Sequence, residues 1–296
     1  MLDIQSPSCA QSFEFLTDSK TQIVFCDKSQ IAEILLDQGF LKLQSNNFIL
    51  TDENVAALYL DCMQVHFLDQ GVSLHPVIVP SSEDSKSLSV YSQCVETILK
   101  IGVDKYSTII SFGGGVVNNL AGFLASTIYR GISLAHIPTT TLSQSDAAID
   151  VKQAINSRFG KNSIGAYYPP KSIVIAVDFL RTLPSRNFYD GISEVIKHAL
   201  CQDDDFLRML SNIELSNSSF EDERLQYVLG KAVQLKIEVM GEYANPHNTF
   251  NDFNEAIKQY GHALGHALEH SSEHQILHGE AIAVGMVFSA FVAARL

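Results

Sequence analysis

The sequence predicts two domains, an α/β domain with a mainly parallel sheet over residues 1–184 and an all-α domain over residues 185–296. In the first domain, short apolar runs alternate with segments of helical periodicity, which is typical of parallel strands joined by crossover helices. In the second domain only the helical period recurs. Apolar residues make up 46% of the chain and charged residues 18%, so each domain can bury a core.

The elements of the first domain follow one another in a regular order. Strands are predicted at 22–26, 47–52, 75–80, 107–112 and 132–138. Helices are predicted between them, at 30–39, 54–69 and 88–102. Because ligands of parallel sheets bind at the carboxyl ends of the strands, the residues that follow these strands are candidate site residues. They are Asp52, Ser81–Lys86, Gly113–Gly115 and Thr139–Thr141.

The rest of the chain contains one long polar segment and then four helical patterns. Residues 138–170 are polar and contain glycines, and a connection of this length is expected to be structured and functional. Helical periodicity is found at 188–201, 223–242, 253–270 and 279–296. The polar residues 242–252 are predicted to form a loop.

Charge and composition exclude several classes of function. The formal net charge is −13, so a nucleic-acid partner is not expected, and an anionic substrate would need a local cluster of Lys and Arg. No apolar run approaches the roughly 20 residues of a membrane-spanning helix, and the N-terminus lacks the pattern of a secretory signal. Five scattered cysteines are typical of reduced thiols, so we expect a cytoplasmic protein without a membrane partner.

A glycine-rich stretch, SFGGGVVNNLAGF at 111–123, follows a predicted strand and opens a helix. Three consecutive glycines allow backbone N–H groups to approach a phosphate at a helix N-terminus, where the helix dipole favours anions. The same pattern also fits a tight strand-to-helix turn, and on this fragment the two readings are equally good. Asp52 likewise fits either a ribose contact or a helix cap.

Half of the ten histidines lie at four-residue intervals, at 262, 266, 270, 274 and 278. Residues four apart share one helix face, so the first three fit a single helix. The polar stretch at 271–274 interrupts the pattern, and the five are not expected to share one straight helix. Spacing alone favours a solvated face, because the zinc-helix motif H-E-x-x-H is absent.

An ordered series of motifs resembles the sugar-phosphate cyclases, the family of dehydroquinate synthase. The motifs extend over residues 50–286 in the order of the family, and together they are far more specific than any one of them. They read TDENV, SSEDSK, GGGVVNNLAGF, YRGI, IPTT, GKN, RTLP, EVIKHAL, GHALGHALE and HGEAIAVGM.

The resemblance implies a dehydroquinate synthase-like fold with a Rossmann-like, NAD-binding first domain and a metal-binding second domain. It also implies one divalent ion, zinc or cobalt. NAD would oxidise a ring hydroxyl of a sugar phosphate, phosphate would be eliminated, the ketone would be reduced again, and the opened sugar would close by an intramolecular aldol step. The substrate would be a small sugar phosphate, and the family is commonly homodimeric.

The resemblance also carries over site residues by motif. The metal ligands would be Glu194, His262 and His278. The catalytic groups would be Lys152, Lys197, His266 and Glu194. Substrate and phosphate would be bound by Arg130, Asp146, Lys152, Asn162, Lys197, Lys236 and His266, and the basic residues among them, with Lys161, would form the local positive cluster. NAD would be bound by Asp52, Glu83, Lys86, Gly114, Gly115, Asn119, Thr139, Thr140, Asp146, Lys161 and Thr182. No role is implied for His270 and His274, which are expected at the surface.

Several details predict which cyclase this is. Before the first metal histidine, dehydroquinate synthases supply Arg and Asn, the Arg for the substrate carboxylate, where this chain has Glu255 and Gln259. A Glu255 carboxylate in the position of that Arg would repel the substrate carboxylate. The segments NNLAG, KQAIN, YYPP and YGHALGH look more like 2-deoxy-scyllo-inosose synthases, which cyclise glucose 6-phosphate. Dehydroquinate synthase is the second choice, and a cyclase of a seven-carbon sugar phosphate the third.

Two other classes stay open. A metal-dependent alcohol dehydrogenase of similar architecture would release reduced cofactor instead of recycling it, and an inactive relative would bind NAD without turnover. Family members continue for several dozen residues beyond HGEAIAVGM, whereas this sequence stops at Leu296. The second domain is therefore expected to be truncated, which puts activity in question.

Overall fold

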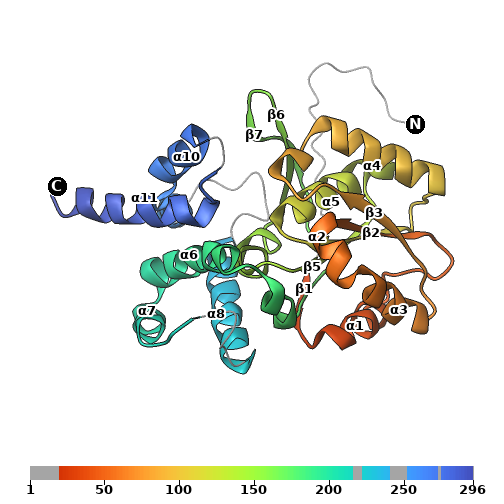
Figure 1. The fold of residues 1–296 in the computed structure, drawn as a ribbon, viewed down its shortest axis with the longest axis horizontal. Coiled ribbons are helices and arrows are strands. Elements are labelled where there is room, and N and C mark those ends of the chain that lie inside the picture. The colour runs from red at the N-terminus through yellow and green to blue at the C-terminus, as the bar shows by residue number, and fades with distance from the viewer. Residues whose placement is uncertain (1–19, 216–221, 241–251, 273–274, 296) are drawn as a thin grey trace, which may run out of the picture.

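The structure is a computed structural model and describes residues 20–215, 222–240, 252–272 and 275–295. Its first half is built on a six-stranded, entirely parallel sheet in the order β1-β8-β5-β4-β2-β3 (Figure 1). The strands are β1 (Gln22–Phe25), β2 (Asn47–Asp52), β3 (Leu74–Val79), β4 (Thr108–Gly113), β5 (Ser133–Pro138) and β8 (Ser172–Ile175). This architecture confirms the predicted α/β class and the five strands read from the sequence.

Helices cover both faces of the sheet, because alternate residues of each buried strand face opposite sides. They are α1 (Ile31–Asp37), α2 (Glu53–Val55), α3 (Asp61–Asp69), α4 (Leu88–Ile101) and α5 (Gly115–Thr127). On one face Ile49 packs with residues of α1 and α3. On the other face Phe48 packs with residues of α4 and α5. The π-helical segment η2 (Ala56–Leu60) joins α2 to α3, so the helix predicted at 54–69 is continuous but irregular.

The long polar segment is structured, as expected, and it contains regular elements that the sequence did not predict. It begins with the π-helical turn η5 (Ser143–Ala147) and continues into an antiparallel ribbon of β6 (Lys152–Ser157) and β7 (Gly160–Tyr167). The sixth strand of the main sheet, β8, follows directly and is also absent from the sequence prediction. Its short apolar run SIVI is the signal that could have indicated it.

The second half is helical throughout the described part of residues 185–295, as predicted. Its helices are α6 (Ser185–Gln202), α7 (Asp204–Ser211), α8 (Asp222–Met240), α9 (Asp252–Gln259), α10 (His262–Ser271) and α11 (His278–Ala293). Helix α6 starts right after the predicted boundary at residue 184, although the existence of two separate domains stays a prediction. The helix predicted at 253–270 is in fact two helices, because Gly261 has a φ of 78° and interrupts it.

The two halves meet along α8 and η5. Val233 of α8 packs against Ile173 and Ile175 of β8, and Lys236 of α8 forms a 2.6 Å ion pair with Asp146 of η5. The β6–β7 ribbon projects from the first half beside the end that carries α10 (Figure 1). No helix among the described residues is long and apolar enough to cross a membrane.

Candidate metal and nucleotide site

Three side chains of the helical half converge on one point. Glu194 lies in the middle of α6, His262 begins α10 and His278 begins α11. The Nε2 atom of His262 is 3.6 Å from Glu194 Oε1, and the Nε2 atom of His278 is 3.3 Å from the same oxygen. These are the three predicted metal ligands, and their ligand atoms all lie within 4.8 Å of one another. Their role as ligands stays a prediction.

Close backbone packing sets this convergence. The Gly279 N–H donates to Asp190 Oδ1 at 2.6 Å, which fixes the start of α11 against α6. A Cβ atom at Gly279 would lie 1.8 Å from the Asp190 carbonyl oxygen, so no larger residue fits there. Gly261 ends the preceding turn with its positive φ and starts α10 with His262. Both imidazoles are therefore placed by glycines next to them in the chain.

Hydrogen bonds prepare the two imidazoles to offer Nε2. The Nδ1 atom of His262 lies 3.1 Å from the Tyr260 carbonyl oxygen, and the Nδ1 atom of His278 lies 3.2 Å from Glu269 Oε2. Since both partners accept hydrogen bonds, each Nδ1 carries a hydrogen and each neutral ring keeps its lone pair on Nε2. That lone pair points toward Glu194, as a metal ligand requires.

The buried carboxylate of Glu194 sets the electrostatics. Burial lowers the pKa of His262 to about 4, and the charge of Lys197 acts in the same direction. Burial disfavours the ionised form of Glu194, but the charges of Lys197 and His278 outweigh it and lower the pKa of Glu194 to about 2. Burial lowers the pKa of His278, yet hydrogen bonds to Glu194 and Glu269 raise it to about 10. A bound divalent ion would place positive charge next to this carboxylate. It would take the place of the proton on His278, which would be released.

The predicted basic residues around this group are paired with carboxylates. Lys197 Nζ lies 2.5 Å from Glu194 Oε2, and both side chains are buried. Lys236 Nζ lies 2.6 Å from Asp146 Oδ1 and 3.7 Å from Asp150 Oδ2. Burial opposes the ionised form of Asp146, but the charge of Lys236 outweighs it, and the pKa of Asp146 falls well below its usual value. The two lysines thus lie in the interior as ion pairs, where lysines are rarely found without partners.

The other predicted groups of the helical half and of the surface lie as follows. His266 is exposed on α10, with its ring centroid 5.1 Å from that of His262. Partial burial of the ring lowers the pKa of His266. Arg130 and Lys152 have exposed side chains, at the ends of a surface turn and of β6 respectively. His270 is exposed, as expected, and the prediction for His274 concerns a residue outside the described ranges.

The nucleotide end of the site lies where α5 begins. The N-cap of α5 is Gly114, so no side chain caps its first N–H groups. A Cβ atom at Gly114 would lie 3.0 Å from Thr140 Cγ2, and one at Gly115 would lie 3.3 Å from Ala147 Cβ. Thr139 is buried at the end of β5, next to this helix start. No side chain caps the N–H groups at this helix N-terminus, and the glycines let a ligand approach them closely. Such a terminus suits a pyrophosphate group, so these residues fit NAD.

The remaining residues near the nucleotide end, Lys86 and Glu83, belong to one hydrogen-bonded network. Lys86 Nζ donates to Asn162 Oδ1 at 2.6 Å, and Asn156 Nδ2 donates to Glu83 Oε1 at 2.8 Å. The Asn162 N–H donates to Asn156 Oδ1 at 2.8 Å, which joins the two pairs. Burial lowers the pKa of Lys86, partly against the charge of Glu83. The network fixes the β6–β7 ribbon to the turn after β3.

Three predicted cofactor residues have local structural partners. Asp52 Oδ1 accepts from the Asn54 and Val55 N–H groups, so it caps α2, as one of its two sequence readings allowed. Asn119 donates to the Gly115 carbonyl oxygen within α5. Thr182 shares a 2.5 Å hydrogen bond with the Tyr59 hydroxyl. These contacts leave a role toward NAD as a prediction.

Sequence reasoning missed two residues that the structure brings into the site. Glu269 is buried and accepts from both Lys161 and His278, and Asp190 holds the start of α11. Glu269 lies inside the motif GHALGHALE, one turn after His266, and that spacing is the only sequence signal that could have indicated it. Asp190 follows no motif, and its contact with Gly279 joins residues far apart in the sequence.

The donor set of the three converging side chains suits a divalent ion. One carboxylate and two imidazoles are typical of zinc and cobalt sites that keep open positions for a substrate. Both oxygens of Glu194 are buried without a geometrically regular hydrogen bond, although Lys197 and the imidazoles surround them. A buried carboxylate in this condition is stabilised by a cation. The residues therefore fit the metal that the sequence predicts.

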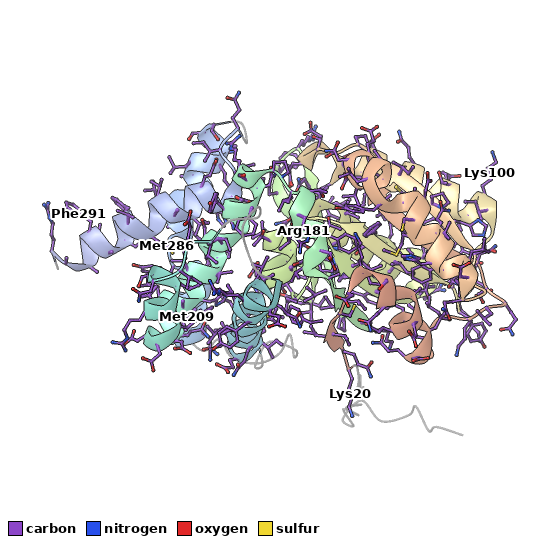
Figure 2. The ribbon with its side chains drawn as sticks, turned by 60° about the horizontal axis from the view of Figure 1, so that its bottom comes forward. Lys20, Lys100, Arg181, Met209, Met286 and Phe291 are labelled. Atoms are coloured by element: carbon purple, nitrogen blue, oxygen red, sulfur yellow. The ribbon has the colours of Figure 1, made fainter. Side chains whose placement is uncertain are left out.

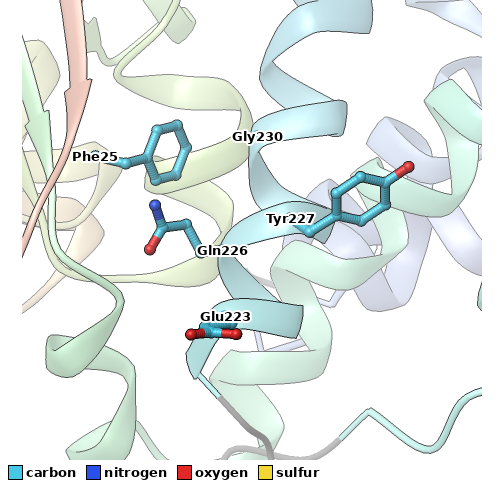
Figure 3. A pocket seen from close by; sticks show the side chains of 5 residues that line it. All are labelled: Phe25, Glu223, Gln226, Tyr227 and Gly230. Atoms are coloured by element: carbon cyan, nitrogen blue, oxygen red, sulfur yellow. The ribbon is translucent and has the colours of Figure 1, made fainter.

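A hollow of about 380 Å³ lies apart from these residues, between β1 and α8 (Figure 3). It is lined by Phe25, Glu223, Gln226, Tyr227 and Gly230. None of these is a predicted site residue, and the hollow holds no cluster of metal-ligating groups. The candidate site is therefore the group of converging side chains and not this hollow.

Comparison with known proteins agrees with this geometry. The 3-dehydroquinate synthase N-terminal family matches residues 76–190, and the 3-dehydroquinate synthase C-terminal family matches residues 191–296. A 3-dehydroquinate synthase of Geobacillus kaustophilus is 41% identical over 249 residues, which is 84% of this chain and 66% of the relative. A 2-deoxy-scyllo-inosose synthase of Streptomyces ribosidificus is 34% identical over 252 residues, 85% of this chain and 63% of the relative. The chain thus spans about two thirds of the length of these relatives.

Solved structures show the same fold. A 2-deoxy-scyllo-inosose synthase crystallised with carbaglucose-6-phosphate, NAD⁺ and Co²⁺ has a TM-score of 0.79 and 28% identity, with 92% of this chain and 74% of that one covered. The 2-epi-5-epi-valiolone synthase of Streptomyces hygroscopicus, with NAD⁺ and Zn²⁺ bound, has a TM-score of 0.82 and 25% identity, with coverage of 93% and 75%. From the two domain families, the relatives and the shared fold, this chain belongs to the 3-dehydroquinate synthase family of sugar-phosphate cyclases.

Proposed function

We propose that this chain converts glucose 6-phosphate to 2-deoxy-scyllo-inosose, with NAD and one divalent metal ion as cofactors. The observation that carries the proposal is the convergence of Glu194, His262 and His278 in a family whose solved members bind NAD⁺ with Co²⁺ or Zn²⁺. When bound, NAD supplies reversible oxidation of a ring hydroxyl, and the metal supplies a Lewis acid for that oxygen. The metal would be zinc or cobalt.

The side chains around these groups have separate tasks in this proposal. Glu194, His262 and His278 hold the metal, with Nε2 of each imidazole turned inward. Lys197, in contact with Glu194, presents its ammonium to the sugar oxygens, and His266 takes or returns a proton at an imidazole nitrogen from the exposed side. Lys152 and Arg130 meet the phosphate, and their exposed positions leave them accessible to it.

The charge balance of the site favours a substrate with few negative charges. The buried lysines Lys86, Lys197 and Lys236 and the exposed Lys161 lie opposite Glu83, Glu269, Glu194, Asp146 and Asp150 among the described residues. The lysines are therefore already neutralised by carboxylates, and a divalent ion would add two positive charges. Such a site suits one phosphate group better than a phosphate together with a carboxylate. Glucose 6-phosphate carries only the phosphate.

A specific observation favours the second candidate, 3-dehydroquinate synthase. Identity to the Geobacillus kaustophilus enzyme is 41%, compared with 34% to the Streptomyces ribosidificus inosose synthase. That enzyme class acts on a carboxylate-bearing sugar phosphate, so the two candidates differ in one charged group of the substrate. The discriminating residue by sequence, Glu255, has a side chain outside the described set. A cyclase of a seven-carbon sugar phosphate, as the valiolone synthase name indicates, is the third candidate.

The test is a direct comparison of substrates. Purified protein with NAD and Zn²⁺ or Co²⁺ is incubated separately with glucose 6-phosphate, the carboxylate-bearing sugar phosphate of 3-dehydroquinate synthases and a seven-carbon sugar phosphate. We expect phosphate release and a carbocycle, identified by mass spectrometry and NMR, from glucose 6-phosphate, without accumulation of NADH. A carbocycle from another substrate would replace the proposal by that candidate. Accumulating NADH would indicate a dehydrogenase, and the absence of turnover with bound NAD an inactive relative.

The other parts of the proposal concern surroundings and assembly. We propose a cytoplasmic homodimer that binds a small sugar phosphate and neither nucleic acid nor membrane. Its support is the net charge of −13 and the scattered cysteines, four of which, Cys26, Cys62, Cys94 and Cys201, are unpaired in the described residues. The mass in solution, measured by light scattering, checks the dimer.

A further inference from the structure

Glu269 is a buried carboxylate with two contacts that lead in opposite directions. Its side chain is 7% exposed, and a charged carboxylate at such a depth needs partners for both oxygens. Oε2 accepts from His278 Nδ1 at 3.2 Å, and Oε1 accepts from Lys161 Nζ at 3.0 Å. The first partner belongs to the helical half and the second to the β6–β7 ribbon of the α/β half.

The contact with His278 sets how that residue faces the metal position. With its Nδ1 hydrogen donated to Glu269, the imidazole has a fixed ring plane, and Nε2, 3.3 Å from Glu194 Oε1, is the nitrogen left to bind a metal. Carboxylates that hold the second nitrogen of a ligating histidine commonly change metal affinity 10- to 100-fold when they are removed. Glu269 is therefore in the place of such a residue.

The contact with Lys161 leads to the nucleotide side. The next residue, Asn162, accepts from Lys86 at 2.6 Å and donates to Asn156 at 2.8 Å. Asn156 in turn donates to Glu83. Five hydrogen bonds thus connect the metal position through Glu269 to Lys86 and Glu83, two predicted NAD residues. Figure 1 shows the ribbon that carries it reaching from the sheet toward the end with α10.

We propose that Glu269 is a positioning residue that couples metal binding to NAD binding by holding His278 with one oxygen and Lys161 with the other. This inference rests on the proposed function, because it assumes that both ligands bind. Binding of either ligand fixes its side of Glu269, so the second ligand finds the carboxylate already placed. Linkage then requires each ligand to raise the affinity of the other by the same factor.

The measurement is isothermal titration calorimetry on the full chain. Zn²⁺ is titrated into protein without NAD and with saturating NAD, and NAD is titrated without and with saturating Zn²⁺. For the wild type we expect NAD to tighten Zn²⁺ about fivefold or more, at the lower end of typical couplings, with the same factor in the reverse experiment. Thermal unfolding of the metal-free variants, followed by circular dichroism, checks that each is folded.

Two variants separate the two arms of Glu269. Glu269→Gln is expected to weaken Zn²⁺ binding by about 10- to 100-fold and to reduce the coupling factor to about one. Lys161→Met is expected to leave Zn²⁺ binding without NAD within about twofold of wild type, yet to abolish the coupling. Lys231→Met is the matched control, because it removes a Lys–Asp contact of 2.9 Å in the helical half, and its coupling factor should equal that of the wild type.

The outcomes distinguish the inference from the proposed function. Failure of the wild type to bind Zn²⁺ or NAD would overturn both. Binding of both ligands with a coupling factor of one would overturn the inference alone. If Lys161→Met weakened NAD equally with and without Zn²⁺, the lysine would act on NAD itself and the coupling would be refuted.

Discussion

The α/β half and the helical half bring their candidate residues to the site in different ways. In the α/β half these residues lie at the carboxyl ends of strands, where Asp52 is the last residue of β2, Gly114 follows β4 and Thr139 follows β5. In the helical half the metal candidates lie on three separate helices, and Glu194 is in the middle of one. The first arrangement depends on chain direction and backbone N–H groups, and the second on particular side chains. We therefore expect a single substitution to cause a modest loss of ligand binding in the α/β half and a nearly complete loss in the helical half.

The largest expected effect comes from His262→Ala in the helical half. Loss of one of three ligands should remove the metal and turnover, while the fold and much of the NAD binding persist, because the predicted NAD residues lie mainly in the other half. Elemental analysis of the purified variant measures the metal. His270→Ala is the matched control on the same helix, since its side chain is exposed, and it should keep its metal. Unchanged metal content in His262→Ala would contradict the ligand assignment.

The second prediction concerns the ion pair that joins the halves. Lys236→Met removes a buried ammonium that lies 2.6 Å from the partly buried carboxylate of Asp146, and breaking a buried ion pair typically costs about 3–5 kcal/mol of unfolding free energy. Urea unfolding of both proteins gives the difference. Lys231→Met breaks a partly exposed pair with Asp203, so it should cost less than about 1 kcal/mol. Equal losses of unfolding free energy in the two variants would show that the contact between the halves stabilises the fold no more than the Lys231–Asp203 pair does.

The third prediction is a pH dependence that belongs to the α/β half. His136 is fully buried in β5, with Nδ1 2.6 Å from Ser111 Oγ, and burial lowers its pKa to about 3. The unfolded chain, with a pKa near 6.5, binds a proton between these values and the native state does not. The unfolding free energy should therefore fall as pH falls below 6.5, by up to about 1.4 kcal/mol per pH unit.

The variant His136→Gln isolates this contribution, because it keeps a polar group facing Ser111 but has nothing to titrate. Urea unfolding at several pH values between 7 and 5 should give a shallower slope for the variant than for the wild type. Parallel slopes would show that His136 is protonated in the native state.

The smallest expected effect is that of Gly114→Ala at the nucleotide end. The added Cβ would lie 3.0 Å from Thr140 Cγ2 and in front of the α5 N-terminus, while its φ of −81° is ordinary for alanine. NAD affinity, measured by calorimetry, should fall about fivefold, the equivalent of one helix-terminus contact of about 1 kcal/mol, with little change in stability. Gly230→Ala in α8, with Phe25 4.0 Å from its Cβ, should leave NAD affinity unchanged. A loss of NAD affinity of more than a hundredfold would show that one substitution can cause as large a loss of binding in this half as in the helical half.

Much of the fold could be read from the sequence, because periodicity is a local property. The strands at 47–52 and 107–112 and the helix at 88–102 appear at or within one residue of their predicted positions. The second half is helical as predicted, but its helix ends differ from the predicted ones by up to three residues, the helix predicted at 253–270 is two helices, and α7 was not predicted. The ribbon of β6 and β7 could not be read, since its strands are mostly polar and pair with each other, and only a few residues such as Ile155 pack on the core. The last turns of α11, which carry Phe291, are apolar but exposed (Figure 2). The apolar run predicted the helix, but it could not predict this exposure, which depends on what packs around the helix.

The sequence by itself determined the alternation of strands and helices, the family resemblance and the identity of the three metal candidates, because motifs and periods are written along the chain. Only the tertiary structure decided which atoms meet. It turned both Nε2 atoms toward Glu194, paired Lys236 with Asp146 across the halves and brought Glu269 between His278 and Lys161. Those contacts join segments far apart in sequence, and they depend on where packed helices pass one another, which no local pattern records.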